Sequence, residues 1–255
     1  MSSCSLNESI DAGLMEAFKI AISEGKRSRL CPPPHLEKGM ALPINFLLWA
    51  KLDVDKAAKR YEAYWSTRLE LFGEADLESQ EFASSIEAEL RTGAIELPDA
   101  RANGRQVLLV RMRKMDYTVM TPESVRSLFW FVLHQAYLSE ETIQNGVIGM
   151  NDMNDLDKGK NIRLATAKYL GSSIGNILPV RIAGIKIVRQ PWFFSAVFTV
   201  LSPFLPTKLV SRVEFLGGDL EALKETFPAS SIPQELGGTL DHDHVAWLDG
   251  LLKEQ

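Results

Sequence analysis

Apolar and polar positions repeat with a helical period over much of the chain. Residues 54–72 carry apolar side chains on one face, and Asp53 before them is a good N-cap, which predicts a helix there. The same spacing predicts helices over 122–137 after the cap residue Thr121, and over 162–177 and 244–252. Shorter helices are expected over 14–25, 44–49 and 78–91, so about the first 95 residues are mostly helical.

Short apolar runs alternate with helices in the part of the chain that follows Gly93. Runs over 107–112, 147–150, 180–187 and 213–216 have the length of strands and are rich in branched residues. Turn residues at 99–104 precede the first of these runs. Strands that alternate with helices indicate an α/β domain with a largely parallel sheet.

A very apolar segment from Trp192 to Leu201 separates the last two predicted strands. Its polar side chains, Ser195 and Thr199, form one narrow stripe with Ser202 if the segment is helical. Such a helix is either a buried core helix or one that faces something apolar other than protein. It is too short for a bilayer span, which needs roughly 20 residues.

The composition indicates a globular protein with a substantial core, since 45% of the 255 residues are apolar. Two cysteines, Cys4 and Cys31, are too few for a disulfide framework or a zinc site, and the start of the chain lacks the pattern of a secretory signal. A cytosolic protein is therefore expected. The net charge is −5, but residues 158–213 include nine Lys and Arg and no acid. This acid-free window favours a surface for the phosphates of a membrane, a lipid headgroup or a nucleic acid over scattered solvated cations.

The sequence holds no convincing catalytic constellation. Gly171–Gly175 fits the G-x-S-x-G pattern of serine hydrolases, but the helical spacing before Ser173 conflicts with the strand-to-helix turn that this nucleophile requires. His242 and His244 are interpreted as parts of an exposed polar loop near the end of the chain, and no metal site is expected. His134 lies in a buried helix pattern, which is typical of a hydrogen-bonded histidine in a core or pocket.

Four segments follow one another in a recognisable order: FLLWAKLDVDKA at 46–57, ETIQNG at 141–146, GIKIVRQP at 184–191 with PFL at 203–205, and SIPQELGGTL at 231–240. Together they resemble the CRAL-TRIO (Sec14-like) lipid-binding family, in particular its α-tocopherol transfer protein and cellular retinaldehyde-binding protein branch. The resemblance implies an α/β lobe whose mixed, largely parallel sheet floors an apolar pocket, with an N-terminal helical cap. It divides the chain into a partly helical segment at 1–42, a helical region at 43–95 and a lipid-binding domain at 96–255.

The resemblance also implies which residues act. A mobile gate helix matches the stretch from Pro191 to Leu205, with gate positions Pro191, Trp192, Phe193, Phe198 and Leu201. The ligand-binding positions that carry over are Phe129, Leu133, Val147, Leu170, Ile174, Leu178, Val180, Phe194 and Val197. The family positions that bind phosphoinositide phosphates match three cations inside the acid-free window, Arg181, Lys208 and Arg212. A fourth family cation is missing, since Leu48 and Ala50 stand in its place beside Lys51.

We therefore expect a non-enzymatic, monomeric, cytoplasmic carrier, peripheral on membranes, that transfers a tocopherol-, retinoid- or other lipid-like ligand and docks on phosphoinositide-containing membranes. No cofactor, metal or nucleic acid is expected. Phe129 and Leu133 replace serines of the tocopherol binders, and Val180 replaces a glutamate of the phosphatidylinositol carriers, which argues against those two cargoes. The alternatives are a phosphoinositide-reading membrane adaptor without cargo transfer and, more remotely, a serine hydrolase that uses Ser173.

Overall fold

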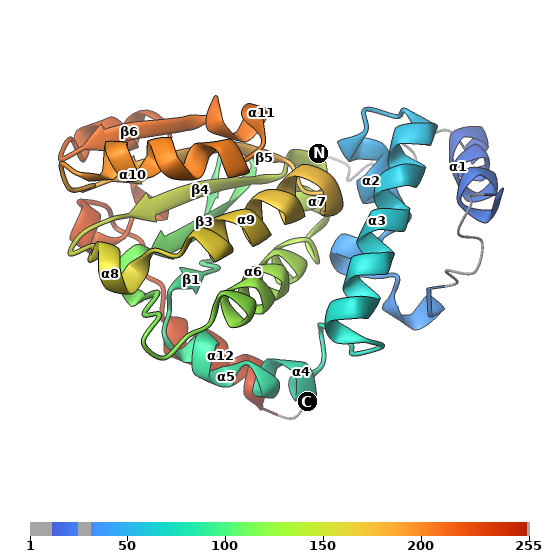
Figure 1. Cartoon of the computed structure of the whole chain (residues 1–255), viewed down its shortest axis with the longest axis horizontal. Helices are drawn as coiled ribbons and strands as arrows, with labels where there is room; N and C mark the ends of the chain where they lie inside the picture. The colour runs from blue at the N-terminus through green and yellow to red at the C-terminus, as the bar shows by residue number, and fades with distance from the viewer. Residues whose placement is uncertain (1–11, 25–31, 254–255) are drawn as a thin grey trace.

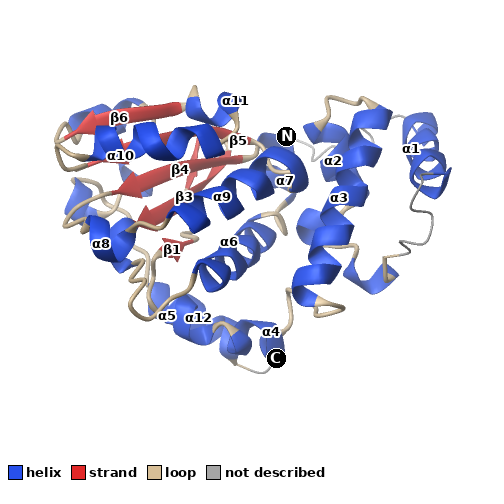
Figure 2. Cartoon of the chain, in the orientation of Figure 1, coloured by secondary structure: helices blue, strands red, loops and turns tan. Residues whose placement is uncertain are grey.

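The computed structural model describes residues 12–24 and 32–253, so Cys4 and Cys31 lie outside the described residues. The chain forms a helical part, α1 to α3, beside an α/β part built on a six-stranded sheet (Figure 1; Figure 2). The predicted α/β class with a largely parallel sheet is confirmed.

The helical part comprises α1 (Ala12–Glu24), α2 (Pro43–Trp49) and α3 (Val54–Phe72), with the short 3₁₀ turns η2 (Pro34–Leu36) and η3 (Gly39–Ala41) between α1 and α2. As predicted, Asp53 caps α3 by accepting a hydrogen bond from the backbone N–H of Lys56. Aromatic rings hold the helices together, and the stacked rings of Tyr64 and Trp130, 5.5 Å apart, join this part to the α/β part.

The predicted single helix over 78–91 is wrong. The structure has α4 (Gln80–Ser85) and α5 (Glu87–Arg91), separated at Ile86, whose backbone leaves the helical region at φ −120° and ψ 22°. The side chain of Ile86 is buried in the core, so the interruption of the helix lets this residue pack inward. The helices end before the first strand, close to the boundary expected at residue 95.

The sheet consists of β1 (Ile95–Glu96), β2 (Arg101–Ala102), β3 (Arg105–Arg111), β4 (Val147–Asp152), β5 (Ile182–Val188) and β6 (Val213–Gly217). Its order is β1-β3-β4-β5-β6, with β3 to β6 parallel and with β1 and β2 antiparallel to β3. The sequence indicated only the turn at Asn103-Gly104, where both φ angles are positive, because two-residue strands carry no measurable period.

The alternation of side chains along the strands gives the sheet two different faces. Val107 and Leu109 point to one face, which is covered by residues of the C-terminal segment such as Phe227 and Ile232. That segment runs through the 3₁₀ turns η7 (Glu221–Glu225), η8 (Ala229–Ser231) and η9 (Gln234–Leu236). Leu108 and Val110 point to the opposite face, which helices cover.

The helices of the α/β part are α6 (Pro122–Ala136), α7 (Glu140–Asn145), α8 (Lys158–Asn161), α9 (Leu164–Ser172), α10 (Phe194–Leu201), α11 (Thr207–Val210) and α12 (His244–Leu252). Thr121 and Ser124 form a capping box at the start of α6. The turn η4 (Met112–Lys114) follows β3, and η6 (Ser202–Phe204) follows α10. Figure 1 shows α9 and α10 on the same side of the sheet.

Two predictions in this part need correction. The helix over 162–177 begins at Leu164 and ends in a π-helical turn, η5 (Ser173–Ile177), and Leu164 is 40% exposed at its first turn rather than packed inward. His242 and His244 do not belong to an exposed loop, because Asp243 caps α12 and both imidazoles are partly buried. None of the helices in the described ranges combines the length and apolarity that a bilayer crossing requires.

Candidate functional site

An apolar cavity of about 220 Å³ lies between the sheet and the helices α9 and α10. The residues that form its floor come from the helix-covered face of three neighbouring parallel strands: Leu108, Val110, Val147, Gly149, Asn151, Ile182, Ile185 and Ile187. Most of these residues follow the two-residue repeat of a strand, and a register shift between β4 and β5 brings Ile182 and Ile185 to the same face. A cavity of about 150 Å³ is already large enough to bind benzene, so this one can hold a larger apolar group.

The helix α10 closes the cavity with one side and meets solvent with the other. Phe194, Phe198 and Leu201 line the cavity, whereas Val200 is 62% exposed and Trp192, just before the helix, is 93% exposed. The interpretation of this segment as a buried core helix is therefore wrong, since Phe194 is its single buried residue. An apolar helix that leaves this much surface uncovered satisfies the second interpretation, a contact with an apolar partner that is not protein.

The cavity has one polar end, at the segment between β3 and α6 and at the start of α9. The hydroxyl of Tyr117 donates a hydrogen bond to Oγ1 of Thr166 at 2.6 Å. The side-chain amide of Asn161 donates to the carbonyls of Arg113 and Met115, both at 3.1 Å. Burial raises the pKa of Tyr117, so its hydroxyl stays neutral at physiological pH and remains a hydrogen-bond donor.

Arg163 also belongs to this polar end. Its guanidinium donates to the carbonyls of Gly159 and Ile162 and lies 5.2 Å from the ring centre of Tyr117. Because these contacts already occupy part of its donor set, Arg163 supports the shape of this end of the cavity. Among the lining residues, all of which lie in the described ranges, the remaining side chains are neutral.

The predicted ligand-binding residues divide into two groups. Those that line the cavity are Phe129, Val147, Leu170, Ile174 and Phe194. Leu133, Leu178 and Val180 are buried in the main core, and Val197 packs beside Phe194 in a smaller cluster, so these four lie outside the lining. Of the gate positions, Phe198 and Leu201 face the cavity, while Pro191, Trp192 and Phe193 do not.

Sequence reasoning missed the lining residues contributed by irregular segments. Met112, Met115 and Tyr117 come from η4 and the loop after it, and Asn161 and Arg163 come from the junction of α8 and α9. None of these segments has a helical or strand period that would single out an inward-facing side chain. Met115, Tyr117 and Asn161 lie outside every predicted element, whereas Met112 and Arg163 lie at the ends of the strand predicted over 107–112 and the helix predicted over 162–177.

The three predicted phosphate-binding cations lie just before the amino ends of the neighbouring strands β5 and β6. Arg181 directly precedes β5, and the guanidinium of Arg212 donates to the carbonyl of Ile182, the first residue of that strand. Lys208 lies on α11, one turn before Arg212, and both are exposed. Arg181 is partly held by the carbonyls of Ile143 and Gln144 at the end of α7. The structure therefore places Arg212 against the first residue of β5, the neighbour of Arg181 in sequence, and leaves Lys208 exposed on α11.

Two other cations of the acid-free window pair with carboxylates outside it. Lys186 pairs with Glu214, and Arg189 pairs with Asp152, whose carboxylate oxygen is 2.5 Å from the guanidinium. Within the described ranges, no ion pair involves Arg181, Lys208 or Arg212. The same holds for Lys158, Lys160, Arg163 and Lys168, so within the described residues the positive field extends over most of the acid-free window.

The G-x-S-x-G motif has a structural context that differs from that of a hydrolase nucleophile. Ser173 begins the π-helical turn η5 and is buried, and its hydroxyl accepts a hydrogen bond from the indole N–H of Trp130 at 3.2 Å. The helix α9, rather than a strand, comes directly before it, so this position lacks the strained strand-to-helix turn that exposes a catalytic serine. The two glycines of the motif instead face the segment that follows α10, near Phe204 and Pro206.

Comparisons with known proteins agree with this architecture. A family model described as "CRAL/TRIO domain" matches residues 90–238. The human protein named "Alpha-tocopherol transfer protein-like" is 28% identical over 223 residues, which cover 84% of this chain and 63% of that protein. The rat protein named "Clavesin-1" is 28% identical over 159 residues, covering 58% of this chain and 43% of that protein.

A solved structure titled "Crystal structure of Sfh5" superposes with a TM-score of 0.62 and covers 97% of this chain and 92% of that chain. Its sequence is 11% identical, so this likeness concerns the fold. The alignment with the human tocopherol-transfer-like protein spans less than two thirds of that relative.

Proposed function

This chain belongs to the CRAL/TRIO domain family, and from that premise we propose that it binds a small hydrophobic ligand in the cavity beneath α10 and carries it between membranes. The observation that supports this function best is an apolar cavity closed by a helix whose outer side is also apolar and exposed. A buried core helix would show apolar contacts on both sides, whereas a lid over a ligand needs an inner surface for the ligand and an outer surface for a membrane.

The lining narrows the class of ligand. Its side chains are neutral and mostly apolar except at the end formed by Tyr117, Thr166, Asn161 and Arg163. We infer a ligand with a long apolar body and one small uncharged polar group, such as a hydroxyl or carbonyl, placed at the Tyr117–Thr166 hydrogen bond. A charged headgroup placed in the apolar part of the cavity would lose its hydration and would find no hydrogen-bonding or charged partner there.

The energetics suit a carrier. A ligand that buries about 500 Å² of apolar surface gains roughly 12 kcal/mol relative to water, before the cost of association. A bilayer offers such a molecule nearly the same gain, so the transfer between bilayer and cavity is close to balanced. Small changes in the position of α10 at a membrane are then sufficient to determine whether the ligand enters or leaves.

We further infer that α10 and its neighbours dock on an anionic, phosphoinositide-containing membrane. Trp192 and Val200 supply apolar side chains for the interfacial region, and Lys208 and Arg212 supply exposed cations on the adjoining segment. Arg181 completes the cationic group beside Arg212. This location makes the protein cytoplasmic and peripheral on membranes, and the monomeric state remains a prediction.

The test of cargo binding fills the cavity without disturbing the sheet. A Cβ on Gly149 would meet Ile185 at 3.5 Å, an ordinary contact, so Gly149→Leu places a larger side chain on the floor of the cavity. The matched control is Gly184→Leu on the neighbouring strand β5, because a Cβ there would approach Ile148 on the opposite face of the sheet. Both variants and the parent protein are given retinaldehyde in liposomes, and the bound lipid is quantified by mass spectrometry of organic extracts.

We expect the parent and Gly184→Leu to retain a stoichiometric hydrophobic ligand and Gly149→Leu to lose it. Extracts that contain no lipid from any of the proteins, together with undiminished binding to phosphoinositide liposomes, would instead support a membrane adaptor without cargo. Equal lipid content in Gly149→Leu and in the parent would show that the ligand does not occupy this cavity.

A further inference from the structure

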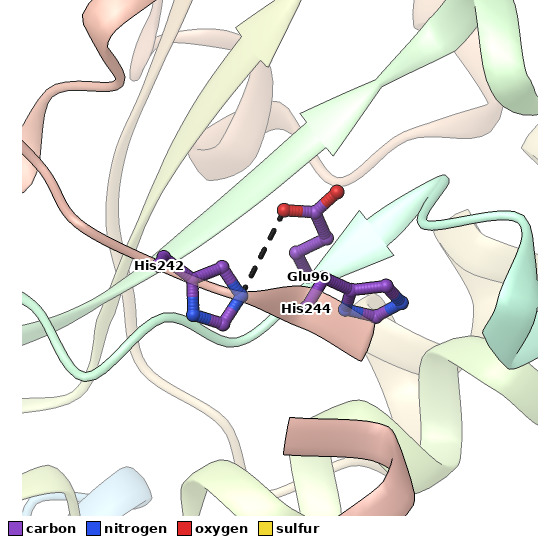
Figure 3. A group of neighbouring side chains, drawn as sticks. All are labelled: Glu96, His242 and His244. Atoms are coloured by element: carbon purple, nitrogen blue, oxygen red, sulfur yellow. Dashed lines mark ion pairs between the residues drawn. The ribbon is translucent and has the colours of Figure 1, made fainter. Parts of the chain in front are cut away.

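A second cluster of chemically active side chains lies away from the cavity. Figure 3 shows Glu96, at the end of β1, beside His242 and His244, which flank the start of α12. One ligand atom from each of the three residues lies within 4.8 Å of the others. The side chain of Glu96 is 4% exposed and that of His242 is 11% exposed, so the cluster is largely shielded from water.

One ring nitrogen of each of the two imidazoles makes no hydrogen bond. His244 Nε2 lies 2.8 Å from the carbonyl of Leu90, and a carbonyl only accepts, so this nitrogen carries the proton and Nδ1 carries a lone pair. His244 Nδ1 is buried without a hydrogen-bond partner, and the same holds for His242 Nε2. Buried nitrogens without partners are costly, and a metal ion is a ligand that would satisfy both.

We propose that Glu96, His242 and His244 bind a divalent transition-metal ion of the zinc class. The carboxylate of Glu96, Nε2 of His242 and Nδ1 of His244 are the protein ligands, and water completes a tetrahedral set. Ligands at zinc distances of about 2.1 Å are roughly 3.4 Å apart in a tetrahedron. His242 Nε2 and Glu96 Oε2 are already 3.8 Å apart, so small side-chain rotations are sufficient.

The surroundings of the cluster both favour and limit metal binding. The hydrogen bond from His244 to Leu90 resembles the outer contacts that fix the orientation of metal-bound histidines. Arg111 and Lys114 contact Glu96 through Oε1, which leaves Oε2 on the side of His242. These two cations repel a dication, so we expect micromolar affinity rather than that of a closed structural zinc site.

A metal at this position would join two parts of the chain that are far apart in sequence. Glu96 belongs to the first strand of the sheet, and His244 begins the C-terminal helix, which packs against α4 and α5. The ion would therefore fix the C-terminal helix to the sheet. Because binding to the folded state stabilises it, the melting temperature of the full chain is expected to rise when zinc is added.

The test uses the full chain with Cys4→Ser and Cys31→Ser, so that thiols outside the described residues do not bind metal. The chelator-treated protein is titrated with zinc chloride by calorimetry and with cobalt chloride by visible absorption, which reports a tetrahedral site. The same titrations are carried out on His242→Ala and on Glu96→Gln, a milder change if the first variant folds poorly. His35→Ala, which removes an exposed histidine elsewhere, is the matched control.

One zinc ion per chain, a loss of affinity of at least tenfold in His242→Ala and Glu96→Gln, and no change in His35→Ala are the expected results. The melting temperature should rise with zinc in the parent and in His35→Ala alone. The absence of saturable zinc binding at submillimolar concentration, or equal binding by all variants, would overturn the proposal and identify the cluster as a buried polar network.

Discussion

The α-carbon of Gly171 in α9 faces the backbone carbonyl of Phe204, which ends the segment after α10. A Cβ built on Gly171 would be 1.8 Å from this carbonyl oxygen, so no other residue fits while α10 is in this position. Gly175, one turn further along, would place a Cβ 3.0 Å from the ring of Pro206. The two glycines of the G-x-S-x-G motif therefore pack directly against the segment that follows α10, and this contact explains the motif better than a catalytic serine does.

Gly171→Ala is expected to destabilise the closed position of α10. The new methyl group meets backbone, which cannot rotate away, and overpacking of this kind costs about 1–3 kcal/mol. Because that cost falls on the closed state, we expect the affinity for the cavity ligand to fall by roughly tenfold and its release to accelerate. Stopped-flow fluorescence of a hydrophobic probe leaving the protein measures both effects.

Two further variants calibrate that result. Gly175→Ala should have a smaller effect, because the flexible ring of Pro206 can move by a few tenths of an ångström. Ser172→Ala alters an exposed neighbour in the same turn and should leave release unchanged. Identical release rates for Gly171→Ala and Ser172→Ala would mean that this contact does not control the gate.

Membrane docking is expected to depend on one aromatic residue and two cations. Each Lys or Arg close to an anionic surface contributes about 1 kcal/mol, so Lys208→Ala combined with Arg212→Ala should weaken binding to phosphoinositide liposomes by roughly 30-fold. Trp192→Ala should weaken binding to neutral liposomes as well, because it removes an exposed indole suited to the interfacial region. Liposome co-sedimentation at two salt concentrations separates the contributions, since salt screens only the cationic one.

The control for charge is Lys19→Ala combined with Lys59→Ala, which removes two exposed lysines from α1 and α3. Its binding to liposomes should match that of the parent protein. If this control lost as much affinity as the Lys208 and Arg212 variant, docking would reflect overall charge instead of a defined surface. Circular dichroism of each variant verifies that the loss of the bond from Arg212 to Ile182 has not altered the fold.

Sequence periodicity predicted the regular elements well because burial on one face imposes it. Asp53 and Thr121 begin α3 and α6 as expected, and the four parallel strands were all identified. The prediction was wrong at Ile86, where the helix is interrupted and the side chain of Ile86 is buried in the core. It also missed β1 and β2, which depend on pairing with β3 rather than on any local pattern.

The candidate site was less predictable for a related reason. Lining residues on regular elements, such as Phe129 and Leu170, follow the periodic pattern, but Tyr117 and Asn161 project from loops whose course depends on tertiary contacts. Leu133 illustrates the opposite error, since it is apolar and inward-facing on α6 but packs in the main core outside the cavity. Periodicity identifies which side chains point inward and does not distinguish a packed core from a cavity.

Arg60 is expected to hold the helical part against the α/β part. It is 5% exposed, its guanidinium lies 3.4 Å from the ring centre of Trp49, and it donates to the carbonyls of Ile174, Gly175 and Leu178. Burial lowers the pKa of Arg60 to about 10, so it stays charged at neutral pH. Arg60→Met leaves these carbonyls without a donor and should cost about 2–4 kcal/mol in urea unfolding, whereas Lys59→Met on the exposed side should cost little.

His134 makes the stability of the protein depend on pH in a defined direction. Its side chain is buried, as expected for a core histidine, and its Nε2 lies 3.2 Å from the carboxylate of Glu78. Burial lowers the pKa of His134 below its ordinary value, and the charge of Arg68 lowers it further. Glu78 and Asp76 act in the opposite direction but do not reverse the shift. The unfolded chain therefore binds a proton near pH 6.5 that the folded chain does not.

The contribution of His134 to the free energy of unfolding is therefore complete at a pH above the ordinary histidine pKa of about 6.5. It declines as the pH falls through that value, by at most about 1.4 kcal/mol for each pH unit. The window between about pH 7.5 and about pH 5.5 lies above the titration of Glu78, whose own pKa is lowered by the hydrogen bond with His134, so that carboxylate stays ionised throughout. Urea unfolding of His134→Gln, which keeps a donor for Glu78, should show a smaller loss of stability across this window than the parent or the exposed-site control His35→Gln. Other groups add the same slope to all three proteins, so the decisive quantity is the difference between them, and equal slopes would show that His134 titrates alike in the folded and unfolded chains.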